Sequence, residues 1–325
     1  MKRWKLIWIF LLINSGNTLF AQDNMENHSL KISFENDFLN FRGDGTDRYF
    51  TNGLRIDYFF KKQKIKFPSS LLLKISTDKN LYSWGVAQYM FTPSSIDVAD
   101  IQYNDRPYAG ALFAIHSLIS FDYTNKLKLS SQLFLGVMGP MSLAEETQIF
   151  VHSTFNYPRP KGWANQVPND LIINYNIRVE KEMIYLPGKL LISGNIETFN
   201  GTLYNGMGAG FMMKVGRIIN YFRENDAENT MLDHKMQFYV FMKPAARVIY
   251  SNALLEGGII TNINQAHKGY ILNKDQIERL NVFADVGVIY EHPKFGLAIM
   301  QKMRTSDFKG GNAMEVGSIS LNFKL

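Results

Sequence analysis

The chain has 325 residues and contains no cysteine. This absence excludes a disulfide framework and every metal or redox site that depends on thiolates. The sequence also lacks a G-x-S-x-G nucleophile elbow, an H-E-x-x-H zinc motif and a glycine-rich phosphate loop followed by a lysine. Ordinary serine-hydrolase and zinc-peptidase functions therefore lose support.

Long apolar runs are scarce as well. An apolar run from Leu6 to Ile13 follows three basic residues and precedes small and polar residues up to Ala21. This run is far shorter than the roughly 20 residues of a membrane-spanning helix. Residues 1–21 are therefore predicted to be a secretory signal peptide rather than a membrane anchor.

The excess of positive charge is small. The whole chain has 35 basic and 29 acidic residues, a formal charge of +6. Removal of the three basic residues of the signal peptide leaves 32 against 29, or +3. Such a balance argues against a nucleic-acid partner.

Aromatic residues, in contrast, are abundant, with 24 Phe and 16 Tyr. Apolar and polar residues alternate along many segments, most cleanly in the final nine residues, GSISLNFKL. Such alternation gives a strand one lipid-facing side and one polar, lumen-facing side. In residues 51–60 it places Thr51, Gly53, Arg55 and Asp57 on the inner face, where the arginine and the aspartate can pair. The sequence therefore predicts an all-β fold, a transmembrane antiparallel β-barrel.

The predicted barrel has about twelve strands, at residues 29–37, 50–60, 81–91, 108–121, 126–138, 170–184, 189–199, 206–218, 236–248, 281–291, 294–304 and 314–325. A further apolar piece, Ala253 to Ile263, is assigned to a long loop because single-chain bacterial barrels have an even number of strands. A soluble β-sandwich or a lipocalin-like barrel is the alternative, since each strand signal is weak. Without repeats or linkers, residues 22–325 are predicted to form one domain.

Three long connections face outward if the N-terminus is periplasmic: residues 38–49, 92–107 and 139–169. Candidate functional residues gather at their edges: Glu35, Asn36 and Asp37; Asp47, Arg48, Tyr49 and Thr51; Asp105, Arg106, Pro107 and Tyr108; Gln148 and His152. A closed barrel brings distant strand ends together. Their carboxylate and amide oxygens suit a hard cation such as calcium. Taken singly, however, an Asn-Asp pair is usually a turn and an Asp-Arg pair a salt bridge.

The segment SLAEETQIFVHS, residues 142–153, predicts one short helix in an otherwise β-rich chain. Ser142 is a suitable N-cap, and Glu145 three residues on completes a capping box. Gln148 and His152 are four residues apart and share one face, so Gln148 can hydrogen-bond the imidazole or a substrate beside it. A lone loop histidine is more often simply solvated.

Five segments together resemble one known family. They are FEND at 34–37, TDRYFTNGLR at 46–55, QYMFTP at 88–93, NDRPYAG at 104–110, and GVMGPMSLAEETQIFVH with KGWANQ between 136 and 166. In order and spacing they resemble the outer-membrane lipid A 3′-O-deacylases, the LpxR family, across nearly the whole mature chain. The resemblance implies a twelve-stranded barrel in the bacterial outer membrane, with lipid A or lipopolysaccharide as substrate.

The resemblance also implies roles for individual residues. The family's catalytic histidine falls on His152, its Asn-Asp pair on Asn36 and Asp37, its strand-two threonine on Thr51 and its helix glutamine on Gln148. A calcium ion, with Asp37 and Asn36 as ligands, is the implied cofactor. Two departures weaken the match: the YPRP stretch around Pro158 replaces an acidic residue of the cation site, and the loop SSIDVADIQYN lacks the family's basic run.

These implications lead to a hypothesis of ester hydrolysis. Neutral His152 would take a proton from water, the water would attack the acyl carbonyl, and calcium or fixed donors would hold the oxyanion. Asp37 would ligate the ion or orient the imidazole, Asn36 and Thr51 would position the carbonyl or the ion, and Gln148 would fix the helix face. Two alternatives remain: an outer-membrane phospholipase with the same site, and a non-catalytic barrel that serves as a pore or an adhesin.

Overall fold

The computed structural model describes residues 28–40, 48–61, 67–76, 79–223, 236–263 and 269–325. The predicted signal peptide and Asp47 lie outside these ranges. Among the described residues, no helix combines the length and the apolar character that crossing a membrane requires.

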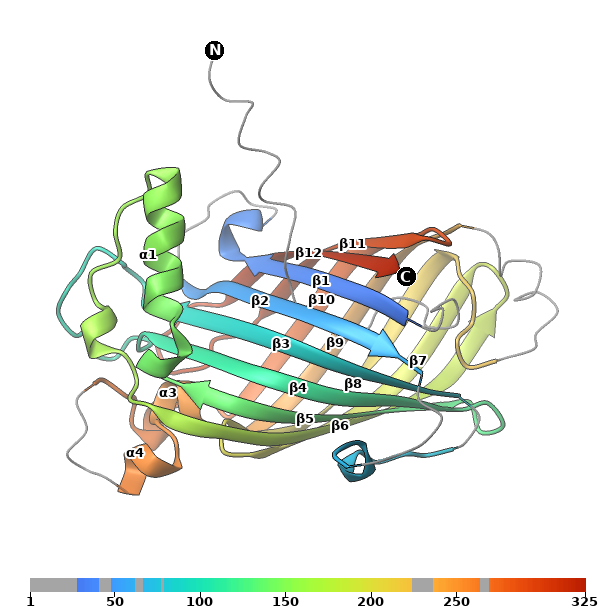
Figure 1. Ribbon diagram of the computed structural model, residues 1–325, viewed down its shortest axis with the longest axis horizontal. Coiled ribbons are helices and arrows are strands. Elements are labelled where there is room, and N and C mark those ends of the chain that lie inside the picture. Colours follow the sequence, from blue (N-terminus) through green and yellow to red (C-terminus); the bar gives the residue numbers. More distant parts are fainter. Residues whose placement is uncertain (1–27, 41–47, 62–66, 77–78, 224–235, 264–268) are drawn as a thin grey trace, which may run out of the picture.

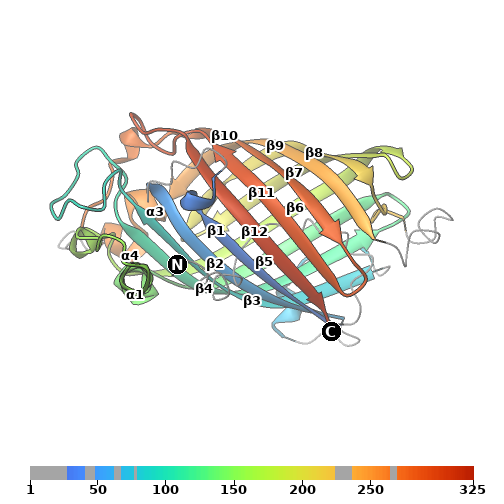
Figure 2. The same ribbon diagram turned by 90° about the horizontal axis from the view of Figure 1, so that it is seen from above.

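Twelve antiparallel strands form a closed barrel (Figures 1 and 2). Each strand pairs with its neighbours in chain order, and β1 (His28–Asn36) pairs with β12 (Met314–Lys324) to close the ring. The other strands are β2 (Tyr49–Phe60), β3 (Lys79–Thr92), β4 (Ala109–Asp122), β5 (Leu127–Met138), β6 (Asp170–Leu186), β7 (Leu190–Gly201), β8 (Tyr204–Arg217), β9 (Gln237–Asn252), β10 (Leu280–Glu291) and β11 (Phe295–Arg304). The predicted fold and strand number are confirmed.

The two faces of the wall differ as the alternation predicts. Large apolar side chains are exposed on the outer face, among them Trp84, Val86, Leu135, Ile173, Ile196 and Val240. The inner face carries ion pairs: Arg55 bonds Asp57 over 2.8 Å, and Arg178 pairs with Glu197. An apolar exterior around a polar interior suits a barrel that sits in lipid.

Buried side chains extend into the lumen at both ends of the barrel. One cluster of buried apolar residues closes one mouth, including Phe50, Phe91 and Phe308, and a second near the other mouth includes Phe121, Phe222 and Phe241. Ion pairs occupy the space between, for example Lys128 with Glu180.

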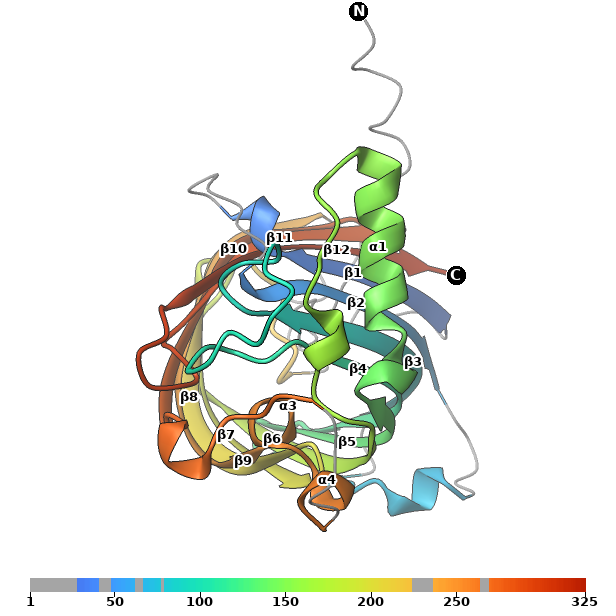
Figure 3. The same cartoon turned by 90° about the vertical axis from the view of Figure 1, so that its left-hand side faces the viewer.

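The two ends of the barrel have different structures. At the terminal end, β1 begins, β12 ends and the strand connections include tight turns. At the helix end lie η2 (Asp37–Leu39), α1 (Ala144–Phe155), α3 (Ala253–Glu256) and α4 (Ile259–Ile263), as Figure 3 shows. The apolar piece from Ala253 to Ile263 thus forms short helices in a loop and adds no thirteenth strand, as predicted.

Candidate functional site

Helix α1 begins one residue later than the sequence predicts, with Leu143 rather than Ser142 as the N-cap residue. Ser142 belongs to a preceding 3-10 turn, η4 (Pro140–Ser142), where its hydroxyl donates to the carbonyl of Gly139 over 2.6 Å. Leu143, with a φ of 58°, is the N-cap residue and makes no side-chain cap. The predicted capping box of Ser142 and Glu145 is therefore wrong, because the tight turn after β5 already engages the hydroxyl.

One face of α1 is buried, first by the barrel wall and then by the loop that returns after the helix. Its buried residues, Ala144, Gln148 and His152, recur every four positions, as the helical period requires. Ala144 packs with Met90 of β3 and with two aromatic residues of the flanking loops, Tyr108 and Trp163. A side chain at Gly110 of β4 would clash with Ser142 and Ala144, so glycine permits this close approach. The predicted shared face of Gln148 and His152 is confirmed.

The helix lies on the outside of the wall. Along β3, Trp84 and Val86 are exposed to the exterior, and Gln88 and Met90 continue the same alternation. Gln88 donates its side-chain amide to the carbonyl of Ser142 over 2.7 Å. Figures 1 and 3 show α1 standing in front of the strand ends rather than in the lumen. The site therefore faces the lipid side of the barrel.

The imidazole of His152 has a defined hydrogen bond. Asn156 ends α1 with a φ of 58°, and the returning chain brings the carbonyl of Pro158 to 2.5 Å from Nδ1 of His152. A carbonyl oxygen only accepts, so Nδ1 carries the proton. In the neutral ring this leaves the lone pair on Nε2, the tautomer a general base needs. The YPRP stretch that departs from the family pattern thus supplies the orienting group.

Gln148 is held from one side only. Its Oε1 accepts a hydrogen bond from the indole nitrogen of Trp163 over 2.7 Å, while its Nε2 has no hydrogen-bond partner among the described residues. The residue is only 2% exposed. An unsatisfied buried amide costs about 1–3 kcal/mol. This N–H group is therefore suited to donate a hydrogen bond to an oxygen of a ligand.

Asn36, Asp37 and Thr51 lie where β1 ends and β2 begins. The amide of Asn36 donates to the carbonyl of Thr51 over 2.9 Å, and its oxygen accepts from the amide of Phe38 over 2.8 Å. Asp37 is buried and accepts from the backbone amide of Arg48 over 2.9 Å.

A register shift between Phe50 and Asn52 takes Thr51 out of regular pairing. Its hydroxyl lies 2.7 Å from the hydroxyl of Thr92, two residues beyond Met90 on the outer face. The prediction that Thr51 faces inward with Arg55 is therefore wrong: the bulge redirects it.

Strand β3 connects this corner with the helix. Thr92 shares the outer face with Met90, which packs against Ala144. His152 is eight residues further along α1 than Ala144, a rise of about 12 Å. Neighbouring strands are roughly 4.8 Å apart, so this rise spans two to three strands. Figure 1 shows α1 rising past the ends of β4, β3 and β2.

Two of the other predicted candidates, Glu35 and Arg106, form ion pairs inside the barrel. Glu35 points into the lumen and pairs with Lys302. Arg106 donates to Asp307 over 2.8 Å and lies over the ring of Phe91 in the barrel mouth. Burial lowers the pKa of Arg106 to about 10 and Asp307 opposes this, so the guanidinium is charged at neutral pH. The NDRPYAG segment thus closes the mouth of the barrel.

Three contributors to the site escaped sequence reasoning: the Thr92 hydroxyl, the Trp163 indole and the Pro158 carbonyl. Thr92 and Trp163 do lie inside two of the family-like segments, QYMFTP and KGWANQ. Nothing in their spacing assigns them a partner, however, and a backbone carbonyl leaves no signal in a sequence at all.

A metal site rich in carboxylates or histidines is absent from the described residues, where no three such side chains gather. Calcium can use other ligands than carboxylates, since it also binds amide and hydroxyl oxygens. Asp37 offers a carboxylate, and Asn36 and Thr51 offer amide, hydroxyl and carbonyl oxygens, all of them donor types that calcium accepts.

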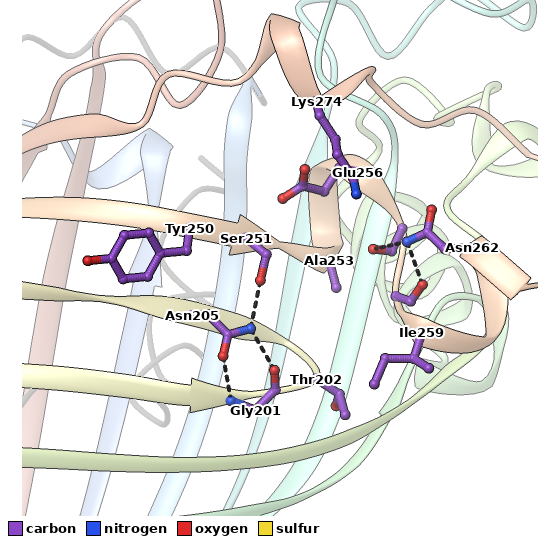
Figure 4. Close-up of a pocket in the computed structure, with 12 residues that line it drawn as sticks. Gly201, Thr202, Asn205, Tyr250, Ser251, Ala253, Glu256, Ile259, Asn262 and Lys274 are labelled. Carbon is purple, nitrogen blue, oxygen red and sulfur yellow. Dashed lines mark hydrogen bonds between the residues drawn. The ribbon is translucent and has the colours of Figure 1, made fainter.

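A separate pocket of about 470 Å³ lies on the opposite wall, between the turn after β7, the end of β9 and the short helices α3 and α4 (Figure 4). Its amides bond to their own surroundings: Asn205 donates to Gly201 and Ser251, and Asn262 donates to Gly258. None of the predicted site residues lines it.

Comparison with known proteins assigns the chain to a family. A family described as outer membrane protein LpxR matches residues 6–325. Among solved structures, LpxR from Salmonella typhimurium has a TM-score of 0.71 at 20% identity, over 91% of this chain and 100% of that chain. The beta domain of the Bordetella autotransporter BrkA has a TM-score of 0.45 at 9% identity, over 92% and 99%. The curated proteins contain no match. The family match spans nearly the whole chain, so this protein belongs to the LpxR family of outer membrane proteins.

Proposed function

We propose that this protein is an esterase that removes a 3′-linked acyl chain from lipid A in the outer leaflet. Family membership supports an outer-membrane protein that acts on lipopolysaccharide. The position of α1 outside the barrel supports a lipid substrate, because an acyl ester in the leaflet reaches the outer face without entering the lumen.

The observation that carries the proposal is the hydrogen bond between Nδ1 of His152 and the carbonyl of Pro158. It sets the tautomer in which Nε2 accepts a proton from water. The water then attacks the acyl carbonyl, and the imidazolium returns the proton to the leaving sugar oxygen. General-base action of this kind contributes about 10²- to 10⁴-fold to the rate.

The remaining residues would position the ester and its developing charge. The unsatisfied Nε2 of Gln148 would donate to the carbonyl oxygen, and one such donor contributes about 10²- to 10³-fold. The hydroxyls of Thr51 and Thr92, 2.7 Å apart, would orient the carbonyl from the wall. Asn36 would hold the backbone of Thr51 in place.

Calcium is proposed as the cofactor. Asp37 would hold the ion together with the oxygens of Asn36 and Thr51, and a bound calcium would add positive charge beside the ester oxygen. A single carboxylate implies weak binding, in the range of about 10⁻⁴ to 10⁻³ M.

The test is mass spectrometry of lipids from cells with and without the gene. Loss of a 3′-linked acyl-oxyacyl group from lipid A is the expected result. Unchanged lipid A together with newly released lysophospholipid would overturn the proposal in favour of the phospholipase alternative. No change in either lipid class would reject both.

A further inference from the structure

The connection between β2 and β3 is longer than a turn, and its described part folds back onto the barrel. Residues 67–76, which include η3 (Ser69–Leu71), lie against the outer wall of β3 to β6 at the terminal end. We call this segment the clip. It is the coil that hangs below the strands in Figure 1 and outside the ring in Figure 3.

The wall beneath the clip carries polar side chains on its outer face. His116 is paired with Trp84, and both lie on the face exposed to the exterior. Ser120 and Ser131 have the same orientation by alternation, yet all three polar residues are buried. Polar groups at lipid-facing positions are costly unless protein satisfies them.

The clip satisfies these polar groups. His116 bonds the hydroxyl of Ser69 over 2.9 Å, and Ser131 donates to the carbonyl of Leu73 over 2.9 Å. Ser120 accepts from the amide of Ile75 over 3.2 Å.

Tyr175 of β6 adds two further bonds. Its hydroxyl donates to the carbonyl of Leu71 and accepts from the amide of Leu73, each over 2.9 Å. Side chains of the wall thus form hydrogen bonds with the backbone of the clip that water would otherwise form. An irregular backbone can lie in a membrane only when protein groups satisfy it in this way.

The side of the clip that faces away from the wall is apolar at its most exposed positions. Phe67 is 80% exposed, and Leu71 and Leu73 are each 50% exposed, while Leu72 between them packs inward with Tyr82 and Leu118. A loop in water would not be expected to present three large apolar side chains in seven residues, whereas a lipid-embedded one would.

The distance of the clip from the terminal rim of the barrel also agrees with a position in the lipid. Leu118, which the clip covers, lies four residues from Asp122, the last residue of β4. At about 3.4 Å per residue and a strand tilt of about 40°, that is roughly 10 Å above the terminal rim. The exposed Lys74 can extend its amine to phosphate groups at the rim.

We infer that the clip is a membrane-embedded segment that contacts phospholipids of the inner leaflet of the outer membrane. It widens the lipid-binding surface of the barrel at the end opposite α1. The inference rests on the wall and the clip alone, and it stands whatever reaction the helix end performs.

The chain offers a direct test because it has no cysteine. The single variants F67C, L71C and L73C would each carry one nitroxide label, in nanodiscs of phosphatidylethanolamine and phosphatidylglycerol. V86C, exposed on the outer wall, is the lipid control, and K189C, in the turn between β6 and β7, is the aqueous control. Heat-modified migration on gels confirms that each variant is folded.

The expected result is that all three clip labels match V86C, with high accessibility to oxygen and low accessibility to a water-soluble nickel chelate. Accessibility to the nickel chelate as high as at K189C would overturn the inference, because the clip would then lie in the periplasm. Low accessibility to both reagents would also overturn it, because protein rather than lipid would cover the clip.

Discussion

The side-chain amide of Asn36 donates a hydrogen bond to the backbone carbonyl of Thr51 over 2.9 Å and thereby ties the end of β1 to the bulge in β2. Its oxygen also accepts from Phe38 and begins the turn that holds Asp37. One side chain thus sets the positions of two other candidate site residues.

Replacement of Asn36 separates these two tasks. Asn36→Asp keeps the acceptor for Phe38 but loses the donor to Thr51, whereas Asn36→Ala loses both. We expect a fall in kcat/KM for both variants, larger for alanine, and a loss of about 0.5–1.5 kcal/mol of stability per hydrogen bond. Deacylation assays on purified protein check this, and full activity of Asn36→Ala would exclude the residue from the site.

The bond between Trp163 and Gln148 supports a second prediction. Trp163→Phe keeps an aromatic ring, although a smaller one, and removes the N–H group that holds Oε1 of Gln148, so the amide should lose its orientation. We expect about a tenfold decrease in kcat/KM with the barrel still folded.

Trp84→Phe is the control for the loss of an indole, because Trp84 lies on the outer face of β3 near the clip, away from α1. Its deacylation rate should equal that of the unchanged protein. Equal losses in the two variants would show that tryptophan removal acts through general destabilisation.

Calcium dependence tests the donor set around Asp37. A chelator should abolish activity, and calcium at about 10⁻⁴ to 10⁻³ M should restore it. Calcium should also raise the thermal unfolding temperature, because a ligand that binds only the folded state stabilises it. Asp37→Asn should require at least about tenfold more calcium in both assays. If neither chelation nor calcium changes activity or unfolding, the oxyanion depends on protein donors alone.

Much of the barrel follows from the sequence because each strand carries a local signal. The predicted strand 206–218, for example, is observed at Tyr204–Arg217, since alternation persists even in this glycine-rich segment. Closure of the barrel can be predicted without any local signal, because a β-sheet in a membrane must close to leave no open edge.

The details that shape the site are tertiary and leave weaker signals. Alternation places Thr51 beside Arg55 on the inner face, and only the pairing of β2 with β3 reveals the bulge that turns it outward. The 20 residues between the predicted strands 50–60 and 81–91 are too many for a simple turn, but their number does not indicate where they fold. Where the clip folds depends on Ser131 and Tyr175, which lie on two other strands.

A pH profile tests the protonation state of the base. Only a neutral imidazole accepts a proton from water. We expect kcat/KM to fall about tenfold per pH unit on the acidic side of a single midpoint, with calcium held saturating. Activity at pH 5 equal to that at pH 8 would contradict a histidine base.

The central claim is that His152 activates the water that cleaves the ester. The most direct measurement is mass spectrometry of lipid A from cells that produce either the unchanged protein or His152→Gln, with equal amounts of heat-modifiable barrel in the outer membrane. The account predicts that the unchanged protein removes the 3′-linked acyl group and that the variant leaves lipid A intact. Removal of that group by the variant at the same rate would contradict it.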